Sequence, residues 1–399
     1  MIHPDSIELP RDSELRDRLL AWCDINSGSD NAAGLDRMRR ALADAFASLP
    51  CKVTDVDLGA GKPRALRVVC RPDAKIQVLL NAHFDTVYGP EHAFQACEIP
   101  AAGVLRGPGV IDDKGGILVL LTALQAFERT PPAANIGWEV ILGPDEETGS
   151  EASAPLYAEA APRFHFGMIF EPARENGDLV RARMGTGIFN ANCRGRAAHA
   201  GRDPSAGRNA ILALAEFLLA VARIPESFPG VMVNVGAIRG GGALNIVPDF
   251  AIAGINARIS SADAGRRFEE QLAAHAGAIN ARDGYRLEIT GQFNRGPLEW
   301  TPAREALFDA YRDTGRALSL DFGWQDVGGG SDGNLLGAAG LPCIDGIGPQ
   351  GGCMHSDREW VRIPSIAGRA RLAALFLARV AAGEIALPPE IAARALARA

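Results

Sequence analysis

The order of apolar and polar positions divides the first half of the chain into short β-type runs and longer stretches with helical periodicity. Strands that alternate with helices are typical of a mostly parallel sheet covered on both faces. The predicted strands are 52–58, 65–70, 76–83, 136–142 and 166–170, and the predicted helices are 12–24, 32–48, 113–129 and 151–159.

From about residue 187 the pattern changes to β-α-β-β-α-β, the element order of a ferredoxin-like unit. The α/β pattern then resumes with helices at 303–316 and 363–381 and a strand near 343–347. The sequence therefore predicts a discontinuous α/β/α main domain (1–186 and 295–399) with a mostly parallel sheet, and an inserted ferredoxin-like α+β domain (187–294). The inserted elements are strand 187–193, helix 205–223, strands 231–238 and 250–259, helix 264–281 and strand 285–290.

Composition excludes several classes of partner. The 399 residues include 41 basic and 48 acidic side chains, and the net charge of −7 argues against binding to nucleic acid or to an anionic membrane. No apolar run reaches the roughly 18 residues needed to span a membrane. The seven cysteines form no C-x-x-C pair and the N-terminus lacks a secretory signal, so we expect a cytoplasmic protein with reduced thiols.

The apolar run 79–85 ends in two polar residues, His83 and Asp85, two positions apart. Positions i and i+2 of a strand point to the same side, so the two side chains can meet. A histidine with a carboxylate beside it suggests a metal ligand and the partner that fixes its tautomer. The alternative is an ordinary loop histidine.

Two groups of acidic residues follow. Asp112 and Asp113 lie in a glycine-rich loop that enters a helix, a place where acids also serve as ordinary helix starts. Asp145, Glu146 and Glu147 come directly after a strand, at the edge of the sheet where α/β proteins bind ligands. Crowded carboxylates raise one another's pKa, and divalent cations would remove that repulsion. Two adjacent glutamates also suit one metal ligand and one general base.

Two further candidate ligands stand apart from these groups. Glu171 ends another predicted strand, and His355 lies in the glycine-led loop 351–359. Together the motifs offer two histidines and three carboxylates. That donor set suits zinc, with cobalt or manganese as alternatives.

At these motifs the sequence resembles the zinc-dependent exopeptidases and amidohydrolases that include bacterial glutamate carboxypeptidase, aminoacylase and succinyl-diaminopimelate desuccinylase. The resemblance implies two metal ions bridged by Asp112 and a water molecule. The matching motifs are His-x-Asp (83–85), Gly-x-x-Asp-Asp-Lys-Gly (109–115), Asp-Glu-Glu (145–147), Phe-Glu-Pro (170–172), His-Ala-Gly-x-x-Pro (199–204) and the late His355.

The resemblance also implies a role for each candidate. One ion would be held by His83 and Glu171 as well, and the other by Glu147 and His355. Asp85 would orient His83, and Glu146 would be the base. The main domain would be catalytic, and the inserted domain would act as a lid and dimerisation domain.

In the inserted domain, the resemblance implies that His199 stabilises the oxyanion, often across the interface of a homodimer. The ordinary alternative is a surface histidine. Asn245 and Arg258 match substrate-binding positions, and an arginine can hold a carboxylate bidentately. The residues Gly329, Gly330 and Ser331 belong to a glycine-rich loop that resembles a substrate-binding loop of the family.

The function implied is hydrolysis of an amide next to a free carboxylate, carboxypeptidase-like, with a dipeptide or an N-acyl amino acid as the substrate. An N-acyl amino acid deacylase is the alternative within this chemistry. No lysine follows Glu171 closely, as it does in some glutamate-cleaving relatives, so glutamate specificity is not implied. A non-catalytic binding protein is disfavoured because all five expected ligands are present. A nucleotide-dependent enzyme is disfavoured because 328–333 lacks the Gly-Lys-Ser/Thr ending of a phosphate loop.

Overall fold

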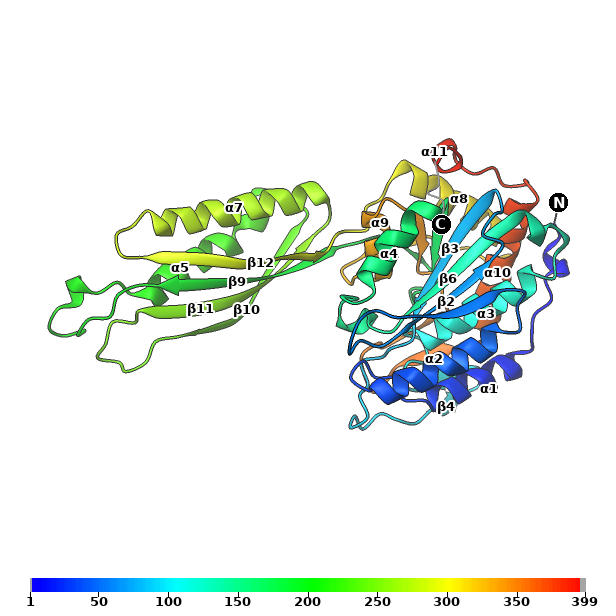
Figure 1. Ribbon diagram of the computed structural model, residues 1–399, viewed down its shortest axis with the longest axis horizontal. Helices are drawn as coiled ribbons and strands as arrows, with labels where there is room; N and C mark the ends of the chain where they lie inside the picture. The colour runs from blue at the N-terminus through cyan, green and yellow to red at the C-terminus, as the bar shows by residue number, and fades with distance from the viewer. Residues whose placement is uncertain (1, 395–399) are drawn as a thin grey trace. The chain divides into compact units, whose positions relative to one another are not determined.

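A computed structural model describes residues 2–394 and divides them into two compact units (Figure 1). Unit 1 consists of the described residues up to Arg181, Trp300–Val327, and those from Ser331 onward. Unit 2 consists of Ala182–Glu299 and Gly328–Gly330. The domain limits predicted at 186/187 and 294/295 stay a prediction, and their outermost residues, 1 and 395–399, lie outside the described residues.

Unit 1 is built around an eight-stranded sheet with the order β1-β2-β6-β3-β7-β14-β8-β13. The central strands β6, β3, β7 and β14 run parallel, whereas β1, β2 and β8 pair antiparallel with their neighbours. This mixed α/β architecture confirms the predicted fold class. The strands are β1 (Lys52–Val56), β2 (Ala65–Cys70), β3 (Ile76–His83), β6 (Ile136–Gly143), β7 (Phe166–Ile169), β8 (Leu179–Arg183), β13 (Trp324–Val327) and β14 (Cys343–Asp345).

Successive side chains of a strand point to opposite faces of the sheet, and the apolar ones form two cores, one on each face. Val78 and Leu80 of β3 belong to the larger core, and Leu79 between them belongs to the smaller one. The helices α1, α2, α3, α8 and α10 supply the larger core, and α4 and α9 supply the smaller. The helices are α1 (Asp12–Cys23), α2 (Ala32–Phe46), α3 (Lys114–Phe127), α4 (Ala154–Ala160), α8 (Pro302–Arg316), α9 (Asp332–Ala338), α10 (Ile363–Ala381) and α11 (Pro389–Ala392).

Unit 2 is an antiparallel sheet with the order β10-β11-β9-β12, and its chain order is β-α-β-β-α-β. This is the predicted ferredoxin-like arrangement. Helices α5 and α7 pack on the sheet around one apolar core. The elements are β9 (Gly185–Arg194), α5 (Ala210–Ala222), α6 (Ile224–Ser227), β10 (Val231–Gly240), β11 (Phe250–Ile259), α7 (Ala262–Asn280) and β12 (Arg286–Arg295).

Some elements differ from the sequence prediction. Helix α5 begins at Ala210 rather than at 205, because Asn209 caps it by accepting a hydrogen bond from the Leu212 amide at 3.1 Å. A small antiparallel sheet in unit 1 was not predicted, since strands of two to four residues show no periodicity. It consists of β15 (Gly351–Gly352), β16 (Trp360–Arg362), β5 (Val104–Arg106) and β4 (Glu98–Ala101).

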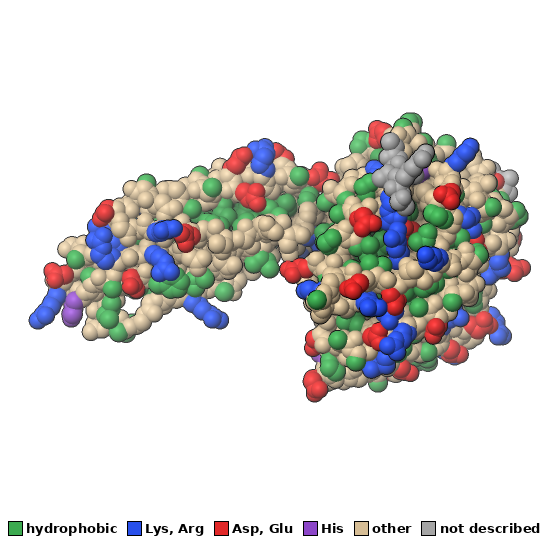
Figure 2. Space-filling model, viewed as in Figure 1, with side chains coloured by type: hydrophobic (Ala, Val, Ile, Leu, Met, Phe, Trp, Pro, Cys, Tyr) green, Lys and Arg blue, Asp and Glu red, His purple; other side chains and the backbone are tan. Residues whose placement is uncertain are grey.

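Two surface properties bear on the sequence analysis. Across residues 2–394, no helix combines the length and the apolar character needed to cross a membrane. On the face of unit 1 that Figure 2 shows, basic and acidic side chains are interspersed. This mixture of signs agrees with the small net charge of the sequence.

Candidate dinuclear metal site

The carboxyl ends of three neighbouring parallel strands position most of the predicted site residues. His83 is the last residue of β3 and pairs in register with Gly143 at the end of β6. The chain continues from β6 into the segment that carries Glu146 and Glu147, and it continues from β7 into Glu171. Such an edge is the usual ligand-binding side of an open α/β sheet.

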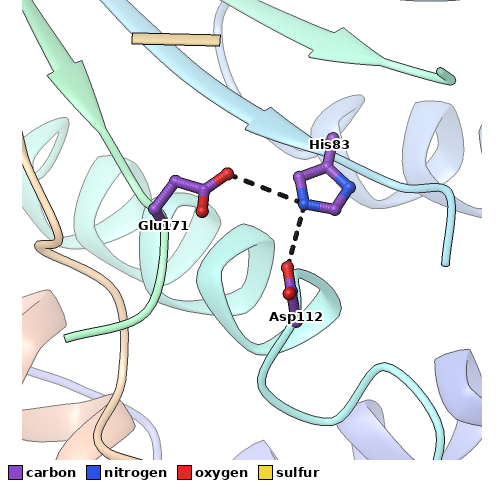
Figure 3. Close-up of side chains that lie close together, drawn as sticks. All are labelled: His83, Asp112 and Glu171. Atoms are coloured by element: carbon purple, nitrogen blue, oxygen red, sulfur yellow. Dashed lines mark hydrogen bonds and ion pairs between the residues drawn. The ribbon is translucent and has the colours of Figure 1, made fainter. Parts of the chain in front are cut away.

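A first cluster consists of His83, Asp112 and Glu171, all buried (Figure 3). The Nε2 atom of His83 lies 3.0 Å from Oδ1 of Asp112 and 3.7 Å from Oε1 of Glu171. The histidine comes from the end of β3 and the aspartate from the loop before α3, and both acidic side chains point to the same ring nitrogen (Figure 3). We call these three residues cluster A.

A second cluster, cluster B, consists of Asp112, Glu147 and His355. The Nε2 atom of His355 lies 3.3 Å from Oδ2 of Asp112 and 3.1 Å from Oε2 of Glu147. Asp112 therefore belongs to both clusters and turns one carboxylate oxygen toward each histidine. In each cluster the three ligand atoms lie within 4.8 Å of one another.

The two clusters bring three carboxylates close together, and positive charge stabilises such an arrangement. Burial disfavours the charged form of His83, yet hydrogen bonds to Asp112 and Asp85 raise the pKa of this imidazole well above its usual value. Hydrogen bonds to Asp112 and Glu147 raise the pKa of His355 to about 11. Burial, followed by repulsion from Asp112, raises the pKa of Glu147 to about 7. Protons on the imidazoles thus balance the carboxylates, and divalent cations could take their place.

The donors present fit such cations. The Oε1 atom of Glu147 is buried and has no hydrogen-bond partner among the described residues. An unpaired carboxylate oxygen in the interior is costly unless a cation or a donor meets it. Two imidazole nitrogens and three carboxylates form a donor set that suits zinc and its neighbours cobalt and manganese. The described residues can therefore hold two metal ions that share Asp112.

Asp85 connects the histidine to the acidic loop. Its carboxylate oxygen Oδ1 lies 3.2 Å from Nδ1 of His83, so Nε2 is the nitrogen turned toward the cluster. The same carboxylate accepts hydrogen bonds from the backbone amides of Glu146 and Glu147, each at 3.1 Å. Ser29 donates a further hydrogen bond to it at 2.8 Å. Asp85 thus fixes the histidine and both glutamates together.

Two other aspartates of the motifs hold the backbone in place. Asp113 accepts a hydrogen bond from the His83 amide at 3.4 Å. Asp145 accepts from the Ala152 amide at 2.8 Å and from the Ser153 hydroxyl, and it belongs to neither cluster. Of the three acids that follow β6, only Glu147 therefore lies in a cluster, and Glu146 beside it is half-buried.

In unit 2, the predicted residues His199 and Asn245 lie in adjacent loops. The Ala200 amide donates to the Asn245 carbonyl oxygen at 2.9 Å, and His199 forms an isolated bridge with Ile246. The side chain of His199 is exposed. Its Nδ1 atom accepts hydrogen bonds from the amides of Gly201 and Arg202 at 3.1 and 3.2 Å. A nitrogen that accepts carries no proton, so the proton of the neutral ring lies on Nε2.

The predicted glycine-rich loop is held by arginines of unit 2. Arg258 donates to the carbonyl oxygen of Gly328, and Arg183 donates to those of Gly329 and Gly330 at 3.4 and 3.2 Å. In unit 1, the hydroxyl of Ser331 caps α9 and donates to Asp345 at 3.1 Å. The Ser331 hydroxyl therefore stabilises the start of α9.

Sequence reasoning missed two residues beside the clusters, Glu359 and Tyr88. Glu359 is completely buried and accepts hydrogen bonds from the backbone at Asp112 and from the Tyr88 hydroxyl. Burial and the charge of Asp112 raise the pKa of Glu359 to about 7. The only signal in the sequence is a glutamate four residues after His355, which has no meaning before the loops are brought together.

A cavity of about 320 Å³ in unit 1 opens beside the clusters. Its lining includes Ile111, Pro172 and Met354, the direct neighbours of Asp112, Glu171 and His355 in the sequence. Ligand pockets commonly have volumes of about 300–1,000 Å³. The cavity is therefore large enough for one amino-acid side chain or a small acyl group. The other lining residues are Ala173, Arg174, Glu175, Asn176, Gln325, Gly351, Gly352 and Cys353.

Comparison with known proteins agrees with this geometry. Carboxypeptidase G2 of Pseudomonas sp. (strain RS-16) is 29% identical over 316 residues, which cover 77% of this chain and 74% of the relative. A tripeptidase from Staphylococcus aureus superposes with a TM-score of 0.78 at 20% identity, covering 94% of this chain and 100% of that structure. A dinuclear metal-binding peptidase of family M20 from Bacillus subtilis superposes with a TM-score of 0.69 at 12% identity, covering 92% and 99%.

The two solved structures support the fold alone, because their sequence identities to this chain are only 20% and 12%. The family follows from the sequence itself, because the profile of peptidase family M20/M25/M40 matches residues 79–379. That range includes all five residues of the two clusters. The chain therefore belongs to peptidase family M20/M25/M40 and is a hydrolase of the metallopeptidase and amidohydrolase class, as its motifs predicted.

Proposed function

We propose that the chain is a dinuclear zinc hydrolase that cleaves an amide bond next to a free carboxylate, in the manner of a carboxypeptidase. The observation that carries the proposal is the position of Asp112, whose two oxygens face the histidines of two separate clusters. In this proposal His83, Asp112 and Glu171 hold one cation, and Asp112, Glu147 and His355 hold the other. The relationship to carboxypeptidase G2 supports the carboxypeptidase branch.

The chemistry follows from the proposed positions. Two cations in these clusters would polarise the scissile carbonyl and lower the pKa of a water molecule. Glu146 would accept a proton from the attacking water and deliver it to the leaving amine, a contribution of about 10²–10⁴-fold. Asp85 accepts a hydrogen bond from the Glu146 amide and contacts Nδ1 of His83, which leaves Nε2 of His83 free to hold a cation.

Unit 2 would bind the substrate and stabilise the developing oxyanion. Arg258 and Asn245, with the backbone of Gly329 and Gly330, are our candidates for holding the free carboxylate. The proton on Nε2 makes His199 a hydrogen-bond donor, which is what an oxyanion requires. Ser331 belongs to this group only by its place in the loop, because its hydroxyl caps α9 and its amide donates to Oδ1 of Asn334 at 3.0 Å.

A screen of dipeptides and N-acyl amino acids with the zinc-, cobalt- and manganese-loaded protein tests this function. We expect hydrolysis of at least one compound with a free terminal carboxylate, loss of activity with a chelator, and recovery when metal is added back. The matched substrate with an amidated terminus should react roughly 10–10²-fold more slowly, since the charge-assisted hydrogen bonds are lost. Faster cleavage of N-acyl amino acids than of dipeptides would favour the deacylase. Activity that resists metal removal would contradict the proposal.

A homodimer through unit 2 is part of the proposal. Strand β10 is an edge strand of ten residues, and most of it is exposed. Met232 and Ile238 on β10 are 57% and 55% exposed, and Leu212 and Leu219 on α5 are 66% and 65% exposed. Apolar side chains also form patches between isolated charges on the face of unit 2 that Figure 2 shows. A long unpaired edge beside apolar surface is suited to pairing with a second copy.

If His199 acts on the partner's site, two inactive variants should complement each other. We expect His199→Ala to lose about 10²–10³-fold in rate. After mixing and subunit exchange with Glu146→Gln, activity should return to about a quarter of the wild-type value, because half of the dimers are mixed and each holds one complete site. A fully active monomer in sedimentation, or mixtures that stay inactive, would contradict this arrangement.

A cytoplasmic location is likewise a proposal. All seven cysteines are free thiols in the structure, as a reducing compartment would keep them.

A further inference from the structure

Glu359 lies where three chain segments of the metal site meet. It is 0% exposed, precedes β16 directly, and follows His355 by four residues. Among the described residues its carboxylate has no cationic side chain within ion-pair distance, and its hydrogen-bond donors are two backbone amides and a hydroxyl. A buried carboxylate arranged in this way acts as a hydrogen-bond acceptor for its surroundings.

One oxygen of Glu359 holds the backbone that leads into Asp112. Its Oε1 atom accepts from the Ile111 amide at 3.0 Å and from the Asp112 amide at 3.2 Å. These two amides lie in a buried loop ahead of α3 and have no other acceptor within residues 2–394. This oxygen therefore fixes the main chain at Ile111 and Asp112 to the loop that carries Glu359.

The other oxygen, Oε2, contacts Tyr88 in the segment that follows β3. The Tyr88 hydroxyl lies 2.8 Å from Oε2 of Glu359 and 2.9 Å from the carbonyl oxygen of Ser356. The main chain adds two more links, because Gly107 donates to the Glu359 carbonyl and the Glu359 amide donates to Ser356, both at 3.1 Å. Glu359 thus joins the Asp112 loop to the loop that carries His355.

Cluster B needs such a link more than cluster A does. The residues of cluster A lie at strand ends and in a buried loop, and its histidine is 1% exposed. In cluster B the side chain of His355 is 55% exposed, and its backbone has a positive φ of 58°. His355 therefore stays near Asp112 only if its loop is fixed to the Asp112 loop.

We propose that Glu359 is a positioning residue of the metal centre, which keeps Asp112 within reach of His355 and so determines the affinity of cluster B for its cation. The inference rests on the proposed function, because it takes the two clusters as cation sites. Glu359 acts through hydrogen bonds to backbone amides, and its charge is not what matters.

Metal titration of the metal-free protein, with zinc bound per chain as the readout, tests this role. Wild type should bind two ions. Glu359→Ala should bind the first ion normally and the second roughly 10–10²-fold more weakly, as is typical when a residue behind a ligand is removed. Glu359→Gln keeps an acceptor for both amides and should bind both ions as wild type does. Tyr88→Phe leaves the amides satisfied and serves as the matched control, with both ions retained.

Each outcome decides one question. Circular dichroism establishes that the variants are folded, and if Glu359→Ala does not fold, Glu359→Met fills the same volume without an acceptor and should show the same loss. Normal binding of the second ion in the alanine or methionine variant overturns the inference. So does a loss in Glu359→Gln as large as in Glu359→Ala, since charge would then be the cause. A wild-type chain that binds no zinc contradicts the proposed function instead.

Discussion

Replacing Glu146 by glutamine should abolish most hydrolysis while leaving the metal in place. An amide cannot take a proton from water, so the rate should fall by about 10²–10⁴-fold. The backbone of residue 146 would still donate to Asp85, and the side chain of Glu146 is not part of either cluster. Turnover measured on a reactive substrate, together with metal content by elemental analysis, checks both halves of the prediction.

Glu151→Gln is the matched control for this change. Glu151 lies in the same loop, is exposed, and belongs to neither cluster, so its variant should retain wild-type turnover. Near-normal turnover in Glu146→Gln with metal bound would remove Glu146 from its role as the base. A loss of both activity and metal would make it a structural residue of the site.

The second large effect is expected at Asp112. Asp112→Asn replaces one of the two oxygens that serve the two clusters by an amide nitrogen, which cannot bind a cation. We expect the variant to bind little zinc at concentrations that fill wild type, and to lose detectable hydrolysis. Direct titration with zinc, read out as ions bound per chain, measures the change.

Single-cluster variants make this prediction specific. Glu171→Gln alters cluster A alone and Glu147→Gln alters cluster B alone, so each should still bind about one ion per chain. An exposed aspartate of unit 1, Asp73, provides a control for loss of charge, and Asp73→Asn should bind as wild type does. If Asp112→Asn kept two tightly bound ions, the shared-ligand arrangement would be wrong.

The sequence was informative where periodicity and strand ends agree. The alternating apolar runs of β3, β6 and β7 predicted parallel strands, and their shared carboxyl edge predicted which side chains would meet. His83, Glu147 and Glu171 all follow from that rule. The β-α-β-β-α-β order likewise predicted the ferredoxin-like unit, because each of its long elements carries a clear pattern.

The sequence was silent where the information lies in contacts between distant segments. By composition Asp145 and Glu147 are equivalent acids, and the resemblance alone assigned Glu147 to the metal. That Asp145 instead accepts hydrogen bonds from Ala152 and Ser153 is visible only in the structure. Glu359 contacts the amides of Ile111 and Asp112, which lie 248 and 247 residues away in the chain. Such partners cannot be deduced from local spacing, because no local rule brings these two loops together.

The discontinuity of unit 1 has a consequence for how the enzyme is made. The chain of unit 2 is continuous except for Gly328–Gly330, whereas the sheet of unit 1 acquires β14 only after all of unit 2 has been synthesised. Helix α10, which packs against α3, and His355 also come from the segment that follows unit 2. Since domains fold as units while the ribosome delivers them, a growing chain passes through a stage with a nearly complete ferredoxin-like body and an unfinished hydrolase half. Cluster B therefore closes only once His355 has been synthesised, after the ferredoxin-like body.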